Sequence, residues 1–160
     1  MSARIVFHHR MANAVEQLAL VLDGLEQVSA QLGWDPSLHM QVALVVEELA
    51  VNAASYGGRA PGEGWVDVQI EQIDGGLRIV IEDNGDPFDP FSVAEPDTAL
   101  DLESRAIGGL GVHFAREMTE QQHYERDGQI NRVTLFKAMP SKGGPAIKTD
   151  HAPFSLRLPR

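Results

Sequence analysis

Apolar residues recur at helical spacing in two long stretches near the amino terminus. The first covers about residues 13–32, where the apolar side chains fall on one side of a helix that Gly33 would end. The second follows Asp35, which has the residue type of a helix N-cap, and Pro36, which suits the first helical position. It runs to about Tyr56, so the pattern predicts two consecutive helices, each followed by glycine.

Alternation of apolar and polar residues predicts strands in the rest of the chain. Residues 65–73 place every second residue on one face, and a turn at 74–76 leads into a strand at 77–82. The remaining predicted elements are a short strand at 3–8, a helix from about 111 to 118, and strands at 121–126 and 129–138 with a turn at 127–128.

This order of elements predicts an α+β fold. We expect a two-layer sandwich, in which helices cover one face of a mostly antiparallel mixed sheet. The segment 83–107 has no regular period, and a loop of this length inside a compact domain is usually functional or mobile. We expect one domain over residues 1–138 and a flexible C-terminal tail over 139–160.

Composition and charge narrow the function classes. With 160 residues, 43% of them hydrophobic, the chain has the size and composition of one globular domain. It has no cysteine, which excludes disulfides, thiolate metal sites and thiol catalysis. Its 13 basic and 23 acidic residues give a net charge of −10, which disfavours general binding to nucleic acid or anionic membranes. No apolar run resembles a signal peptide or a membrane span, so we expect a cytoplasmic protein.

The second predicted helix carries a carboxylate and an amide one turn apart. Glu48 and Asn52 lie on the flank of an apolar stripe, at the border between core and solvent. Such a pair suits a general base and a magnesium ligand, because Mg²⁺ prefers oxygen donors and keeps several waters. The ordinary alternative is a solvated helix flank, on which Glu47 and Glu48 only improve solubility.

A second candidate segment, residues 81–90, follows a predicted strand and opens the long loop. Asp83 at the strand end can accept a hydrogen bond from an exocyclic amine such as that of adenine, and Gly85 would admit a flat ring. The alternative is a plain turn, since Asp, Asn, Gly and Pro are the usual turn residues.

The third candidate segment is the glycine cluster at residues 107–111, which leads into a predicted helix. Free backbone N–H groups at such a junction, together with the helix dipole, favour an anion. The cluster is neither a Walker loop, because no Lys-Ser/Thr follows it, nor a dinucleotide fingerprint, which needs its glycines between a strand and a helix. Taken alone, such a cluster is more often a flexible hinge.

The order of the three segments is more specific than any one of them. E-x-x-x-N on a helix, two strands, D-x-G-x-x-F, a proline-bearing loop and G-G-x-G resemble the N, G1 and G2 boxes of the GHKL ATPase superfamily. Within it, EELAVNAASYG, DNGDPFDP and GGLGVHFAREM are similar to the anti-sigma-factor serine/threonine-protein kinases of the RsbW/SpoIIAB type. The resemblance covers about residues 5–138 and implies the Bergerat ATP-binding fold.

The resemblance also implies a role for each site residue. Asn52 binds Mg²⁺ that bridges the ATP phosphates, and Glu48 is the general base that deprotonates a substrate serine. We assign the base to Glu48 because it, unlike Glu47, shares a helix face with Asn52. Asp83 binds the adenine amino group, and Gly85 lets the ring approach. The other implied ATP contacts are a phosphate contact from Arg105, a lid hinge at Gly108, and backbone N–H groups of Gly109 and Gly111.

Partners follow from the same resemblance. These kinases are homodimers that hold a sigma factor or a comparable regulator inactive, and they phosphorylate a STAS-domain anti-sigma antagonist. Direct contact with nucleic acid or membrane is not expected. The alternative function is a nucleotide-gated protein-binding module without kinase activity. A detached histidine-kinase domain is disfavoured, because its G1 box usually has the form DxGxG, whereas this chain has Pro87 at the second glycine position.

Overall fold

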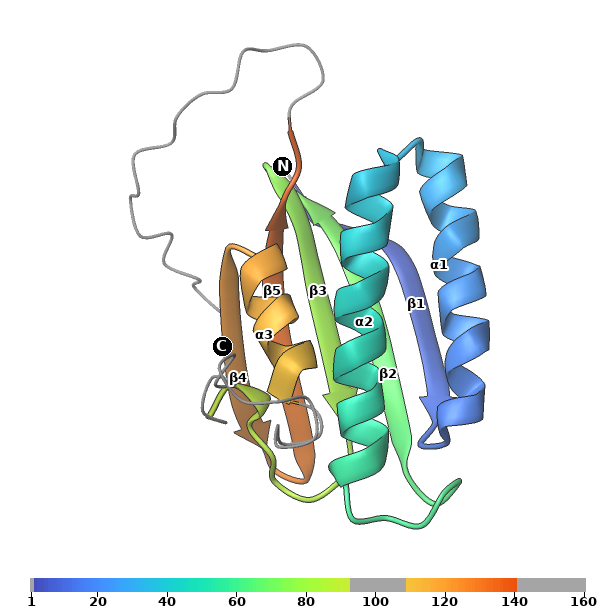
Figure 1. Cartoon of the computed structure of the whole chain (residues 1–160), viewed down its shortest axis with the longest axis vertical. Helices are drawn as coiled ribbons and strands as arrows, with labels where there is room; N and C mark the ends of the chain where they lie inside the picture. Colours follow the sequence, from blue (N-terminus) through green and yellow to red (C-terminus); the bar gives the residue numbers. More distant parts are fainter. Residues whose placement is uncertain (1, 93–108, 141–160) are drawn as a thin grey trace.

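Within residues 2–92 and 109–140, which the computed structural model describes, a five-stranded sheet carries three α-helices on one face (Figure 1). This arrangement confirms the predicted α+β sandwich. The strands are β1 (Arg4–Ala12), β2 (Trp65–Ile73), β3 (Gly76–Asp83), β4 (Gln121–Asp127) and β5 (Ile130–Ala138). The helices are α1 (Leu18–Leu32), α2 (Pro36–Tyr56) and α3 (Gly109–Met118), with short 3₁₀ turns at Val15–Gln17 and Pro90–Ser92.

The sheet has the strand order β1-β2-β3-β5-β4, and every pairing is antiparallel. Two hairpins, β2–β3 and β4–β5, turn at Gly75 and Gly128, whose φ angles of 80° and 58° favour glycine. The central β3–β5 ladder joins these hairpins, and its last pair is Asp83 opposite Asn131. The end of β3 therefore lies beside the start of β5.

Local capping explains where α1 and α2 meet. Gly33 ends α1 in the left-handed conformation, with φ 65°. Asp35 caps α2, because its carboxylate accepts a hydrogen bond of 2.9 Å from the Ser37 N–H, and Pro36 takes the first helical position. The end of α1 and the start of α2 therefore lie where the sequence predicted them.

Branched aliphatic side chains fill the space between the two layers. The fully buried members of this core are Val21, Leu25, Val42, Val45, Val46, Val66, Val68, Ile70, Leu77, Ile79 and Leu135. They come from both long helices and from three strands, so α2 is held against the middle of the sheet. None of the helices in the described ranges is long and apolar enough to cross a membrane.

The structure differs from the predicted elements at three places. β1 extends to Ala12 rather than ending near residue 8, and a 3₁₀ turn precedes α1. α3 begins at Gly109, two residues before its predicted start, because glycine has a low helix propensity and no side chain to show periodicity. Residues 93–108 and 141–160, with most of the predicted loop and tail, lie outside the described residues. Met139 still donates its N–H to the Gly75 carbonyl at 3.0 Å.

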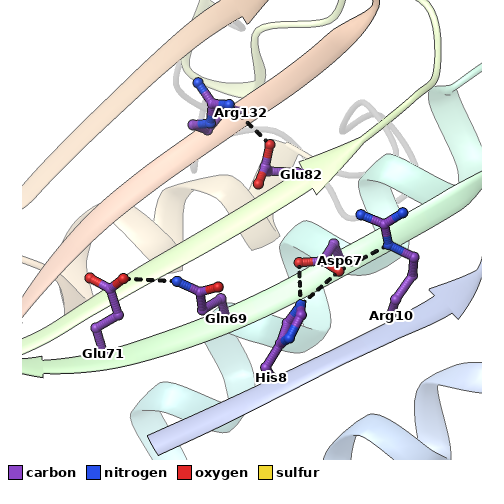
Figure 2. A network of polar contacts seen from close by, with 7 residues as sticks. All are labelled: His8, Arg10, Asp67, Gln69, Glu71, Glu82 and Arg132. Carbon is purple, nitrogen blue, oxygen red and sulfur yellow. Dashed lines mark hydrogen bonds and ion pairs between the residues drawn. The ribbon is translucent and has the colours of Figure 1, made fainter. Parts of the chain in front are cut away.

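The face of the sheet that no described helix covers carries a row of charged residues (Figure 2). Directly opposite one another on the five strands lie Arg10, Asp67, Glu82, Arg132 and Glu125. Arg132 donates to Glu82 at 3.2 Å and to Glu125 at 2.8 Å. This arrangement pairs charges of opposite sign across neighbouring strands, as antiparallel sheets favour.

Asp67 is the most buried charge of this row. Its side chain is 7% exposed, and it accepts hydrogen bonds of 3.0 Å from Arg10 Nε and from His8 Nε2. The Arg10 guanidinium in turn lies 3.8 Å from the centre of the Trp65 ring. The residues that bond to Asp67 therefore also shield its carboxylate from solvent.

Candidate functional site

The candidate site is a small cavity between α2 and the adjoining ends of β3 and β5. It is lined by Leu49, Asn52, Ala53, Ile81, Asp83, Phe88, Pro90, Asn131 and Val133. Asn52 and Asp83, which were predicted from separate segments, thus line the same cavity. About 20 Å³ is free for water-sized molecules, which is room for one water. A purine ring therefore needs part of the cavity wall to move outward.

Asn52 is buried, and the described part of the chain offers its side-chain amide no hydrogen-bond partner. The residue is 5% exposed, on the turn of α2 that follows the buried Leu49. Among the described residues, none forms a hydrogen bond with the Asn52 side chain. Because buried amides normally find partners, this one is placed to bind a ligand or water.

Glu48 lies one turn before Asn52 on α2 and is half-buried, whereas its neighbour Glu47 is exposed. Of the two carboxylates, Glu48 is therefore the one closer to the border between core and solvent. Burial raises the pKa of Glu48 above 4.5, and the negative charge of Glu47 raises it further. A carboxylate with a raised pKa is a stronger base, as proton abstraction near neutral pH requires.

Asp83 is the last residue of β3, and the fold uses one of its two oxygens. Oδ1 accepts hydrogen bonds of 2.9 Å from the Gly85 N–H and from Asn131 Nδ2. Burial raises the pKa of Asp83, while these two bonds and the Arg126 charge lower it by less. In the described part of the chain no group donates to Oδ2, which is therefore available to a ligand amine.

Gly85 lies where the end of α2 meets the loop after β3. A Cβ atom at Gly85 would lie 2.5 Å from the Gly57 Cα and 2.9 Å from the Gly57 carbonyl oxygen. The Asp86 N–H donates to that same carbonyl at 2.9 Å. The close approach of these two backbones gives glycine a structural role here, in addition to the predicted access for a ring.

Sequence analysis missed the role of Asn131 and of an aromatic pair. Asn131 is 3% exposed and bonded to Asp83, and the Phe88 ring stacks on Tyr56 with 5.4 Å between ring centres. One signal was available, because Asn131, Val133 and Leu135 alternate on the inward face of the last strand. A polar residue at an inward position is a candidate for a site.

The part of the glycine cluster that the structure describes lies inside the first turn of α3. Gly109 and Gly111 are the first and third residues of α3, so their N–H groups are among the four without a partner inside the helix. Arg116 of α3 donates to the Phe91 carbonyl, which ties this helix to the loop after β3. Two predicted contacts, Arg105 and Gly108, lie outside the described residues.

Magnesium is compatible with the donors present. The described ranges contain no group of three or more acidic or histidine side chains that could hold a metal ion. Mg²⁺ bound to a nucleotide, however, needs only one or two protein oxygens beside phosphates and waters. The side-chain oxygen of Asn52, to which no described residue bonds, fits that requirement.

Comparisons with known proteins identify the family of the chain. Residues 11–137 match the family described as Histidine kinase-like ATPase domain. Two curated relatives, both named Serine-protein kinase RsbW and both from Bacillus licheniformis, are 23% and 24% identical over 131 and 132 residues. These matches cover 76% of this chain and 78% of each relative.

A solved structure of the RsbU and RsbW domains of a Mycobacterium tuberculosis protein has the same fold, with a TM-score of 0.61 and 16% identity. The match covers 86% of this chain, which spans 32% of that one. At this identity, the structural likeness shows the fold alone.

Proposed function

The chain belongs to the family of histidine kinase-like ATPase domains and is of the RsbW type, and from this premise we propose that it is an ATP-dependent protein-serine/threonine kinase that also acts as an anti-sigma factor. The observation that carries the proposal is the meeting of Asn52 and Asp83 in one cavity. Among the described residues, none bonds to the Asn52 side-chain oxygen, which would suit a nucleotide-bound metal, and none donates to Asp83 Oδ2, which would suit the adenine amine.

In this proposal, Glu48 is the catalytic base. It lies one turn from Asn52, and its raised pKa suits it to accept the proton of a substrate hydroxyl. Asn52 would hold the Mg²⁺ of bound Mg²⁺·ATP; the nucleotide would supply the phosphoryl group, and the metal would neutralise the phosphate charge. Phosphoryl transfer depends mostly on positioning and charge, so one carboxylate base is enough.

The first turn of α3 is the proposed phosphate site. The N–H groups of Gly109 and Gly111 and the positive end of the helix dipole favour an anion there. Arg105 is proposed as a further phosphate contact, and Gly108 as the hinge of the lid.

The proposed partners are proteins. The substrate is a serine or threonine of a STAS-domain anti-sigma antagonist, and the sequestered regulator is a sigma factor or a comparable protein. The net charge of −10 favours a regulator with a basic face. We further propose that the chain acts in the cytoplasm as a homodimer, without contacting nucleic acid or membrane directly.

Calorimetric titration of Mg²⁺·ATP into wild type, Asp83→Asn and Glu48→Gln tests nucleotide binding first. We expect wild type and Glu48→Gln to bind alike and Asp83→Asn to bind at least about tenfold more weakly, because of these two residues only Asp83 is proposed to contact adenine. An absence of binding to wild type at millimolar ATP would overturn the proposal.

Mass spectrometry of a candidate antagonist after incubation with wild type and ATP tests the transfer. Phosphate on serine or threonine supports the kinase, and phosphate on histidine would indicate a histidine-kinase catalytic domain. Binding without any transfer would leave the alternative, a nucleotide-gated binding module. The half-buried Glu48 favours the kinase, because a module that only binds needs no base there.

A further inference from the structure

The side chain of Asn131, at the end of the β3–β5 ladder, forms four hydrogen bonds. Its Nδ2 donates to Asp83 Oδ1 at 2.9 Å and to the Asp86 carbonyl at 2.8 Å. Its Oδ1 accepts from the Tyr124 hydroxyl at 2.6 Å and from the Phe88 N–H at 3.2 Å. Two donors and two acceptors are the full capacity of a carboxamide, so every polar position of this side chain is used.

The partners of Asn131 leave one orientation for its amide. Nδ2 faces two acceptors that carry no proton, a carboxylate and a carbonyl, whereas Oδ1 faces a backbone N–H. Burial also raises the pKa of Tyr124, which keeps its hydroxyl protonated as a donor. A flipped amide would place donor against donor and acceptor against acceptor.

This orientation decides which Asp83 oxygen can bind a ligand. Oδ1 is occupied by Asn131 Nδ2 and by the Gly85 N–H, both at 2.9 Å. Both donors act on the same oxygen, so they fix the carboxylate and leave Oδ2 as the acceptor. Asn131 also anchors the Phe88 backbone, and the Phe88 ring forms an apolar wall of the same cavity. One side chain thus positions both the polar and the apolar contact for a base.

We propose that Asn131 is the positioning residue that gives the nucleotide site its selectivity for a 6-aminopurine. This inference rests on the proposed nucleotide-binding function and adds a specificity determinant to it. Asn131 acts through Asp83, whose Oδ2 must point at the exocyclic amine, and through Phe88, which must lie against the ring. Without Asn131 the carboxylate can rotate, and the site loses its means of distinguishing an amine from a hydrogen at that position.

The test compares ATP with purine riboside triphosphate, which lacks only the 6-amino group. Wild type should bind ATP at least about tenfold more tightly, because an unpaired acceptor is left when the amine is absent. Asn131→Leu removes all four hydrogen bonds, and Asn131→Asp keeps the shape but removes both donors. Both variants should bring the affinity ratio to within about threefold. Thr134→Val is the matched control on β5, since Thr134 is also buried but lies on the opposite face of the sheet, and it should keep the wild-type ratio.

The outcomes separate the inference from the proposed function. Variants that bind both nucleotides more weakly but keep the wild-type ratio would overturn the positioning role and leave Asn131 a structural residue. A wild type that binds neither nucleotide would overturn the nucleotide-binding function itself.

A measurement on wild type tests the inference if the variants do not fold. In protein labelled with ¹⁵N at asparagine, the Asn131 side-chain NH₂ signals should shift on titration with ATP. They should shift much less with purine riboside triphosphate, because only the amine changes the charge distribution on Asp83. Equal shifts with both nucleotides would contradict the proposal.

Discussion

At the scale of single residues, the site holds two carboxyl groups whose pKa values are raised for different mixtures of reasons. The pKa of Glu48 is raised by burial and by repulsion from Glu47, and no hydrogen bond opposes this shift. The pKa of Asp83 is raised by stronger burial, and the hydrogen bonds from Asn131 and Gly85 only partly offset this rise. The first environment suits a group that must take up a proton, and the second suits a fixed acceptor.

Glu48→Gln should lower the rate of phosphoryl transfer by about 10²–10⁴ while ATP binding persists, because a neutral amide cannot accept a proton. In wild type, the rate should rise with pH as Glu48 ionises, through a pKa above 4.5. Glu47→Gln is the matched control. It should keep the maximal rate but shift the acidic limb to lower pH, since one cause of the raised pKa is removed. Initial rates measured from pH 4.5 to 8 check this, and an equal loss of rate in both variants would refute the assignment.

Asp83→Asn should weaken ATP binding by at least about tenfold, because an amide NH₂ would face the adenine amine. Its melting temperature at neutral pH should equal or exceed that of wild type. The raised pKa means that folding favours protonated Asp83, so the native state loses stability as pH rises through that pKa. The amide avoids this loss. Calorimetry and thermal melts at pH 5 and 7.5 measure both effects, and a variant much less stable at neutral pH would contradict the argument.

At the scale of elements, the sequence predicted best where a local chemical signal marks a boundary. Asp35-Pro36 and Gly33 located the junction of α1 and α2, and the glycine turns located both hairpins. The start of α3 was missed because Gly109 and Gly111 have no side chains from which to judge periodicity. The length of β1 was predicted too short, because residues up to Ala12 are part of the strand only through their pairing with β2.

Gly85→Ala should lower the free energy of unfolding by about 1–3 kcal/mol and weaken ATP binding. The added Cβ would lie 2.5 Å from the Gly57 Cα and would push the loop after β3 away from the end of α2. Gly128→Asn is the control, because no atom lies within 4 Å of a Cβ there and asparagine tolerates its φ of 58°. Urea denaturation measures both variants. Equal stability of Gly85→Ala and wild type would show that the close approach of the two backbones is not needed.

At the scale of the whole molecule, the site depends on a pairing that no local signal reveals. Glu48, Asn52, Asp83 and Gly85 were predicted from motifs, since the residues of each motif lie close together in the sequence. Asn131 becomes a site residue only because β5 pairs with β3 and places it opposite Asp83. Strand order is a long-range property, so sequence patterns gave the layers but neither the neighbours in the sheet nor the register.

The charged row on the open face is also a property of the whole sheet, because each member comes from a different strand. Asp67→Asn should destabilise the fold by about 1–3 kcal/mol at neutral pH, since it weakens the hydrogen bonds that Asp67 accepts from Arg10 and His8. ATP affinity should not change, because the row lies on the face away from the cavity. Gln69→Ala, on the same strand and face, is the control and should have a smaller effect. Melting curves and calorimetry check both points, and a lost affinity for ATP would show that the two faces are coupled.

The β3–β5 ladder has a consequence for how the chain could be divided. It is the one strand pairing, within the described residues, between the part before residue 93 and the part after residue 108, and the cavity takes walls from both. A ligand in that cavity therefore holds two halves of a polypeptide together. If the chain were expressed as two fragments cut between residues 92 and 109, Mg²⁺·ATP should promote their reassembly by mass action. The protein would then become a nucleotide-dependent fragment-complementation pair, with a reporter fused to each half responding to ATP.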